Sequence, residues 1–173
     1  MVSEVGRGSS FWFTVKAPAV DLRALQLDVP LPDQTADADL PALRILIVDD
    51  VPVNRHLVTA LLSPFNAVIS EAASGQEAID ASLNEQFDII LMDLQMPGMD
   101  GISATRAIRA TSALNRTTPV LAFSANVLPV HVEACRAAGM NDHIAKPIQP
   151  ESFLTKILFW GEHVQMHRMR QAV

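Results

Sequence analysis

Five residues of this 173-residue chain have side chains that could carry out chemistry together, and each stands near the end of a short apolar run. They are three acids, one hydroxyl and one lysine: Asp49, Asp50, Asp93, Ser124 and Lys146. Carboxylate oxygens are the ligands that a hard divalent cation such as Mg²⁺ prefers, and a carboxylate can act as a covalent nucleophile. A hydroxyl and an ammonium group can contact phosphoryl oxygens, and a metal ion and a lysine neutralise the charge that moves during phosphoryl transfer.

The apolar runs before these residues alternate with segments of helical periodicity. We predict five strands, at 44–48, 67–71, 88–92, 119–123 and 143–145. We predict five helices: one from Pro52 to the residue before Pro64, one after the N-cap Ser74 with its capping-box partner Glu77, and three over 102–110, 127–138 and 151–160. Five such alternations predict an α/β fold, a parallel sheet that is doubly wound with helices on both faces.

In such sheets ligands bind at the carboxyl ends of the strands, so the five polar residues are expected to meet at one edge. Taken singly, each residue has a plain structural alternative. The pair Asp49-Asp50 could be a turn or a helix cap, and Lys146-Pro147 could be an exposed turn. Only their combination, in order at the ends of alternating strands, favours a functional site.

Four segments carry a resemblance to a known family. They are residues 47–50 (IVDD), 92–101 (MDLQMPGMDG), 124–125 (SA) and 146–147 (KP). In type, order and spacing they resemble the response-regulator receiver domains of two-component phosphorelays, over about residues 43–160. The resemblance implies a flavodoxin-like sheet of five parallel strands in the order 2-1-3-4-5, flanked by five helices.

The resemblance also implies a role for each acid. Asp93 would be the phosphoacceptor, which takes a phosphoryl group from a phosphohistidine. Asp50, Asp93 and the backbone carbonyl of Gln95 would bind the cofactor Mg²⁺, and Asp49 would hold the metal through water. This implies a phosphoprotein that assists its own phosphorylation and dephosphorylation.

Other positions are assigned by the same resemblance. Ser124 and Lys146 would contact the phosphoryl oxygens, and Lys146 would be joined to Pro147 by a cis peptide bond. Gln95 and Asn126 occupy the two positions that tune the rate of dephosphorylation in the family. Both are polar and uncharged and could orient or obstruct an attacking water.

His143 departs from the family pattern, which often has Tyr or Phe three residues before the lysine. Either the imidazole acts as a conformational switch in place of that ring, or His143 is a partly exposed histidine at the edge of the sheet. Both interpretations remain open from the sequence.

The chain before residue 43 divides into two regions. Residues 3–15 (SEVGRGSSFWFTV) resemble the last glycine-rich turn and strand of a histidine-kinase ATP-binding domain, with residues 11–15 alternating as a strand would. Residues 17–42 have the proline- and aspartate-containing composition of a linker. The expected organisation is a kinase remnant (1–16), a linker (17–42), a receiver domain (43–160) and a C-terminal tail (161–173), as in a hybrid sensor histidine kinase. No kinase activity is expected of this chain.

Composition excludes several other classes of protein. The net charge of −6 offers no electrostatic footprint for nucleic acid, and we find no secretory signal and no apolar run long enough for a membrane span. The single cysteine, Cys135, is expected to be a buried small hydrophobe. His163 and His167 could share a helix face but have no evident third metal ligand, and we place them in a solvated tail. A cytoplasmic location is expected.

The function predicted is phosphoryl relay, with a histidine-kinase dimerisation domain or a histidine-phosphotransfer domain as partner. The resemblance implies that a partner helix would dock on the first helix near Asn54, Arg55, Leu57 and Val58. The alternative is an unphosphorylated pseudo-receiver that acts as a regulatory binding module. An aspartate-nucleophile phosphatase is disfavoured because Gln95 stands where its second aspartate would be, and a dinucleotide-binding protein because no Gly-x-Gly-x-x-Gly turn follows the first strand.

Overall fold

The computed structural model describes residues 2–4, 8–10, 14, 43–124 and 129–171, and the chain divides into two units, 1–39 and 40–173. In the first unit, β1 (Val2–Glu4) and β2 (Gly8–Ser10) form an antiparallel pair. The expected strand at 11–15 lies outside the described residues except for Thr14, which is not in a strand, and the expected linker 17–42 also lies outside them.

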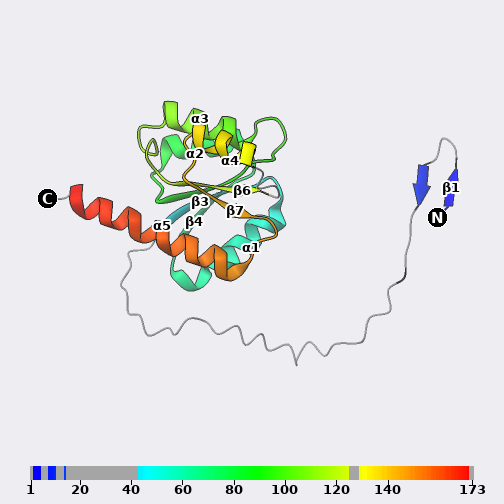
Figure 1. Cartoon of the computed structure of the whole chain (residues 1–173), viewed down its shortest axis with the longest axis horizontal. Helices are drawn as coiled ribbons and strands as arrows, with labels where there is room; N and C mark the ends of the chain where they lie inside the picture. The colour runs from blue at the N-terminus through cyan, green and yellow to red at the C-terminus, as the bar shows by residue number, and fades with distance from the viewer. Residues whose placement is uncertain (1, 5–7, 11–13, 15–42, 125–128, 172–173) are drawn as a thin grey trace, which may run out of the picture. The chain divides into compact units, whose positions relative to one another are not determined.

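The second unit is built on one parallel sheet of five strands (Figure 1). The strands are β3 (Arg44–Val48), β4 (Val68–Ala72), β5 (Ile89–Asp93), β6 (Val120–Ser124) and β7 (Asp142–Ala145). Their order is β4-β3-β5-β6-β7, which confirms the expected order 2-1-3-4-5. The predicted strands agree with these bounds to within one residue at each end. The three inner strands, β3, β5 and β6, are almost entirely buried and apolar because helices cover both faces of the sheet, whereas the edge strands β4 and β7 also carry polar residues.

Helices cover both faces of this sheet (Figure 1). They are α1 (Pro52–Leu62), the short 3₁₀ helix η1 (Ser63–Phe65), α2 (Gly75–Asn84), α3 (Gly101–Thr111), α4 (Pro129–Ala137) and α5 (Pro150–Gln171). Side chains from α2, α3 and α4 pack in one core cluster, which includes the buried Cys135. Side chains from α1 and α5 pack in a second cluster on the other face. The doubly wound arrangement is therefore confirmed.

Several helix ends follow from local chemistry. The Ser74 hydroxyl accepts a hydrogen bond from the Glu77 backbone N–H (3.2 Å), as predicted, while the Glu77 carboxylate accepts from the N–H of Ala73, one residue further back than a capping box requires. Asp100 caps α3 by accepting from the Ser103 N–H (2.6 Å), and that hydrogen bond lowers the pKa of the Asp100 carboxyl. Gly139, with φ +92°, lies just after α4, where a left-handed residue commonly ends a helix.

The last helix differs from its prediction, because α5 continues past Trp160 to Gln171. Gly161 does not end the helix: it is buried, and a Cβ there would lie 2.7 Å from Leu43 Cδ1, so the glycine allows the close approach of α5 to Leu43. The expected tail is therefore helical as far as Gln171, and His163 and His167 lie side by side on it with ring centroids 4.5 Å apart. No helix in the described part of the chain is long and apolar enough to cross a bilayer.

Candidate functional site

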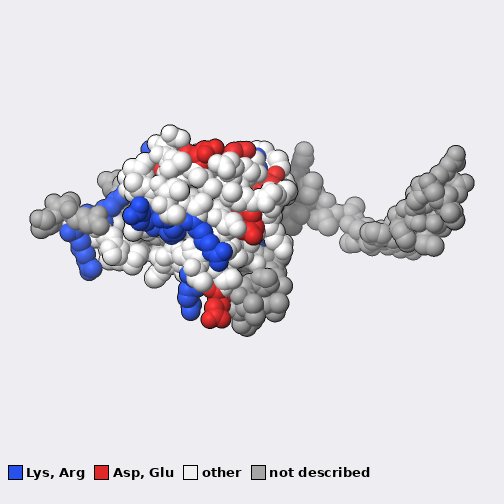
Figure 2. Space-filling model, turned by 90° about the horizontal axis from the view of Figure 1, so that it is seen from above, with Lys and Arg blue, Asp and Glu red and all other residues white. Residues whose placement is uncertain are grey.

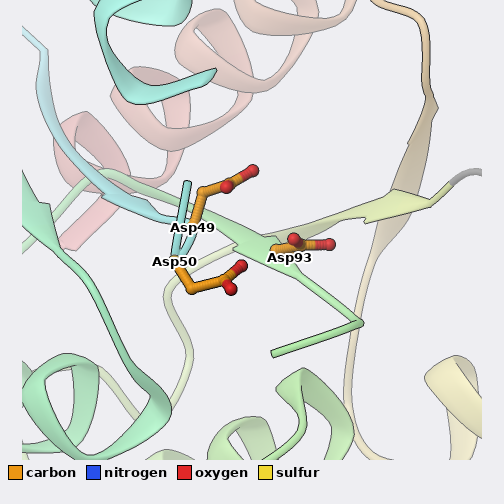
Figure 3. Close-up of side chains that lie close together, drawn as sticks. All are labelled: Asp49, Asp50 and Asp93. Carbon is orange, nitrogen blue, oxygen red and sulfur yellow. The ribbon is translucent and has the colours of Figure 1, made fainter. Parts of the chain in front are cut away.

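Three carboxylates meet where β3 and β5 end. Asp49 and Asp50 follow β3, and Asp93 is the last residue of the neighbouring β5 (Figure 3). One oxygen from each carboxylate lies within 4.8 Å of the other two. Asp49 and Asp93 are only 2% and 5% exposed, while Asp50 is half-buried. The predicted convergence of the three acids is therefore present, and two of the charges are nearly removed from water.

Lys146 bridges two of these carboxylates. Its Nζ lies 2.8 Å from Asp93 Oδ2 and 2.9 Å from Asp49 Oδ2, and 5.9 Å from the centroid of the Phe123 ring. Burial alone would lower the pKa of the Lys146 ammonium, but the hydrogen bonds it donates to Asp93 and Asp49, together with their charges, outweigh burial and raise that pKa. The lysine therefore stays protonated and offsets part of the negative charge of the site.

Asp49 is held by more donors than either other acid. Its carboxylate accepts from the Val51 backbone N–H (2.9 Å), from Asn54 Nδ2 and from Lys146. Its backbone carbonyl accepts from the guanidinium of Arg55 (2.7 Å). In contrast, the Asp50 carboxylate accepts no hydrogen bond from any residue that the structure describes. From the sequence, Asn54 and Arg55 were expected only on a docking surface. Their position at the start of α1, directly after the end of β3, could have indicated that they lie close to the acidic site.

The loop after Asp93 is shaped by close backbone contacts. The Gln95 N–H donates to Asp93 Oδ1 (3.2 Å), so the backbone of the loop lies close to the Asp93 carboxylate. A Cβ on Gly101 would collide with the Asp93 carbonyl oxygen, so only glycine fits where α3 begins. Gly98 has φ +78°, a conformation that favours glycine. The two glycines thus allow the loop conformation that positions Asp93 and the backbone of Gln95.

Ser124 is the last residue of β6, and Lys146 directly follows the neighbouring strand β7. Ser124 ends β6 opposite Ala145 of β7, and the Lys146 N–H donates to the Ser124 carbonyl (2.8 Å). The Lys146–Pro147 peptide bond is cis, the form that the family resemblance implied. Asn126, the second expected tuning residue, lies outside the described residues.

His143 stands on the edge strand β7 with its side chain 43% exposed. Its Nδ1 lies 3.8 Å from Asp142 Oδ1, and His143 lines a cavity of about 220 Å³ together with Ser124, Cys135 and Met140. The geometry is that of a partly exposed sheet-edge histidine beside an open cavity. A switching role of the imidazole stays a hypothesis.

The donor set fits Mg²⁺. Mg²⁺ takes oxygen ligands and is usually bound by one or two carboxylates with several waters retained. Asp50 has lone pairs that no described residue occupies, and Asp93 presents one oxygen beside it. Both carboxylate oxygens of Asp49 already accept hydrogen bonds from protein donors, so Asp49 is suited to act on a cation through water rather than directly.

The fold and the site together define a receiver domain: an acidic trio with a lysine at the carboxyl edge of a five-stranded doubly wound sheet. The sequence model of the response regulator receiver domain matches residues 45–158. This chain belongs to that family.

Curated relatives and solved structures agree with this assignment. The chain is 39% identical over 121 residues to the sensor protein GacS of Pseudomonas syringae pv. syringae (69% of this chain, 13% of that protein) and 30% identical over 161 residues to the aerobic respiration control sensor protein ArcB of Escherichia coli K12 (92% and 20%). The chain therefore spans only a fifth or less of these relatives, and it is homologous to the receiver domains of hybrid sensor histidine kinases in two-component signalling.

A solved structure of similar fold is the receiver domain of sensor histidine kinase PA1611 from Pseudomonas aeruginosa PAO1, with a magnesium ion coordinated in its active site cleft. It is 36% identical to this chain, with a TM-score of 0.64, and the match covers 70% of this chain and 98% of that one.

Proposed function

We propose that this chain accepts a phosphoryl group on Asp93 from a phosphohistidine, with Mg²⁺ as cofactor, as one step of a phosphorelay. The observation that carries the proposal is the environment of the Asp93 carboxylate. It is nearly buried, it lies 2.8 Å from the Lys146 ammonium, and it shares its edge of the sheet with two further carboxylates.

The chemistry divides among the residues of the site. An Asp93 carboxylate oxygen attacks phosphorus, the bond from phosphorus to the donor imidazole nitrogen breaks, and the imidazole leaves with its electron pair. Asp50, Asp93 and the Gln95 carbonyl would hold Mg²⁺, which supplies positive charge to the phosphoryl oxygens. The Lys146 ammonium, which lies 2.8 Å from Asp93, would contact the phosphoryl oxygens once the group is transferred. The Ser124 hydroxyl at the end of β6 is the second expected contact.

The proposal is tested by incubating the protein with acetyl phosphate and Mg²⁺ and measuring intact mass. Wild type is expected to gain one phosphoryl group, and Asp93→Asn to gain none. The matched control is Asp80→Asn, which changes an exposed aspartate of α2 away from the site and is expected to react like wild type. Absence of a mass gain on wild type, under conditions where a known receiver reacts, would favour the pseudo-receiver instead. Label that persists on Asp93→Asn would move the phosphoacceptor elsewhere.

The partner in this proposal carries the phosphohistidine on a helix, either of a kinase dimerisation domain or of a histidine-phosphotransfer domain. An apolar surface suited to such a helix lies on α1 next to the site, where Val53 and Leu57 are 67% and 48% exposed. Nucleic acid is not proposed as a partner, because the net charge is −6; on the face shown in Figure 2, basic side chains form a stripe and separate groups, with acidic side chains on the same face. The location proposed is cytoplasmic.

The proposal extends to the segment before the receiver. The match to ArcB covers 92% of the chain and therefore includes part of the region before residue 43. This supports the interpretation of residues 1–16 as the end of a kinase ATP-binding domain, followed by a linker.

A further inference from the structure

Asn54, in the first turn of α1, touches the acidic site without belonging to the residues that the receiver resemblance assigns to it. We infer that Asn54 is a positioning residue for the cation: its amide fixes the orientation of the Asp49 carboxylate and thereby sets the affinity of the site for Mg²⁺. This inference rests on the metal site of the proposed function, but not on the transfer of a phosphoryl group.

The contact between Asn54 and Asp49 is a two-point one. Asn54 Nδ2 lies 3.0 Å from Asp49 Oδ1 and 3.0 Å from Asp49 Oδ2, so one donor group straddles both oxygens of the carboxylate. A contact to only one oxygen would leave the carboxylate free to turn about its last side-chain bond. Val51 and Lys146 each donate to one oxygen of this carboxylate, which is 2% exposed, and Asn54 donates to both, so we expect Asn54 to contribute most to how the group is turned.

The amide itself stands on a rigid base. The Asn54 N–H donates to the Val51 carbonyl (3.0 Å) in the first turn of α1. The next residue, Arg55, donates to the Asp49 carbonyl (2.7 Å) and to the Glu71 carboxylate on β4 (2.8 Å). These contacts join the start of α1 to the end of β3 and to the neighbouring strand β4. They fix the backbone that carries the Asn54 amide.

A second reason for a functional role is the competition for Asp49. Lys146 donates to Asp49 Oδ2 (2.9 Å) and also contacts Asp93, the proposed metal ligand and phosphoacceptor. Without Asn54, only the Val51 N–H (2.9 Å, to Oδ1) would hold the Asp49 carboxylate against the pull of Lys146 on Oδ2, and its charge would be less firmly directed at the cation. Residues that orient the groups around a metal typically change its affinity by 10- to 100-fold when they are removed. Since Asp49 is expected to act through water, we expect the lower end, about tenfold.

The variant Asn54→Ala removes both donated contacts and places the best helix former in α1, so it is expected to fold. The matched control is Asn84→Ala, which removes an exposed helical asparagine whose amide donates to the Asp80 carbonyl in α2, away from the site. Mg²⁺ binding is measured directly by calorimetric titration of the unphosphorylated protein. We expect the dissociation constant to rise about tenfold for Asn54→Ala and to change less than twofold for Asn84→Ala.

Two further measurements separate positioning from general stability. The thermal midpoint in EDTA is expected to stay within about 3 °C of wild type for Asn54→Ala, which corresponds to about 1 kcal/mol for a domain of this size. Where wild type reacts with acetyl phosphate, the Mg²⁺ concentration for half-maximal rate is expected to rise about tenfold, as for binding, with the maximal rate within about threefold of wild type.

The inference is overturned if Asn54→Ala binds Mg²⁺ within twofold of wild type, or if it is unfolded in EDTA at 25 °C, which would assign Asn54 to stability alone. These outcomes are independent of the proposed function, because the titration needs no phosphoryl donor. A wild type that binds Mg²⁺ but takes no phosphoryl group would refute the proposed function and leave the result on Asn54 standing.

Discussion

Asp50→Asn is expected to make the protein more stable in the absence of a divalent cation. The three carboxylates of the site crowd together, and only Asp49 and Asp93 contact Lys146. Asp50 accepts no hydrogen bond from a described residue, so the substitution breaks no such contact and removes only a charge. The sign of the effect is therefore opposite to that of most substitutions in a partly buried site.

The magnitude follows from the geometry. Two unit charges 4.8 Å apart repel by about 3.5 kcal/mol at an effective dielectric constant of 20. Asp50 is half-buried and Lys146 offsets part of the charge of its neighbours, so we expect about 1–2 kcal/mol of stabilisation after screening. For a domain of this size that corresponds to a rise of roughly 3–6 °C in the thermal midpoint.

Mg²⁺ is expected to reduce or reverse this difference. At ten times its dissociation constant, a ligand that binds only the folded state stabilises it by about 1.4 kcal/mol. Wild type is expected to gain that amount and Asp50→Asn less than half of it, because the variant lacks a proposed metal ligand. The assay is thermal unfolding of both proteins in EDTA and across a Mg²⁺ series, with Asp80→Asn as the control for loss of an exposed aspartate.

The reasoning is refuted if Asp50→Asn is less stable than wild type in EDTA. That result would mean that the carboxylates are not held in mutual repulsion in the metal-free protein. An equal gain from Mg²⁺ in both proteins would remove Asp50 from the metal site while leaving the electrostatic argument intact.

Three further substitutions test the elements that support the site. Gly101→Ala forces a Cβ against the Asp93 carbonyl oxygen, so it is expected to lower the free energy of unfolding in urea by about 1–3 kcal/mol and to slow phosphorylation. An unchanged urea midpoint would show that the loop can move to make room for the Cβ. Burial is the largest influence on the pKa of Asp142 and raises it, but the hydrogen bonds from Lys156, from the His143 N–H and from Trp160, with the charge of Lys156, together outweigh burial and lower the pKa. Asp142→Asn is therefore expected to lose about 1–2 kcal/mol at pH 7, and this loss is expected to disappear as the pH falls below about 4. A loss that does not depend on pH would contradict this assignment. Ser74→Ala removes the cap of α2 and is expected to cost about 1 kcal/mol by the same measurement, with no effect on Mg²⁺ binding.

Much of the sheet was predictable because its signals are local. Each buried strand is an apolar run, and a polar residue ends the run where the strand meets solvent or the site. Asp93 was expected one residue beyond its strand and is in fact the last residue of β5. The N-cap at Ser74 was predictable for the same reason, because donor and acceptor are three residues apart.

The length of α5 was not predictable from local signals. Glycine is a common residue at the end of a helix, so Gly161 suggested that α5 ends there. Gly161 is instead buried where α5 crosses Leu43, a residue more than a hundred positions earlier. Further along, Arg168 pairs with the buried Asp88 at 2.6 Å, a contact that no spacing in the sequence indicates. Tertiary packing therefore decided that the helix continues.

The sequence by itself determined which chemical groups stand at the strand ends and in what order, because these depend on residue type and on local periodicity. Only the tertiary structure decided which of those groups touch. Lys146 and Asp49 are 97 positions apart and lie 2.9 Å from each other, and the Asn54 amide straddles one acid while Asp50 is left without a donor among the described residues. Parallel strands bring distant residues to one edge, but the distances there depend on how each helix begins and how each loop returns, which is settled by packing across the whole domain.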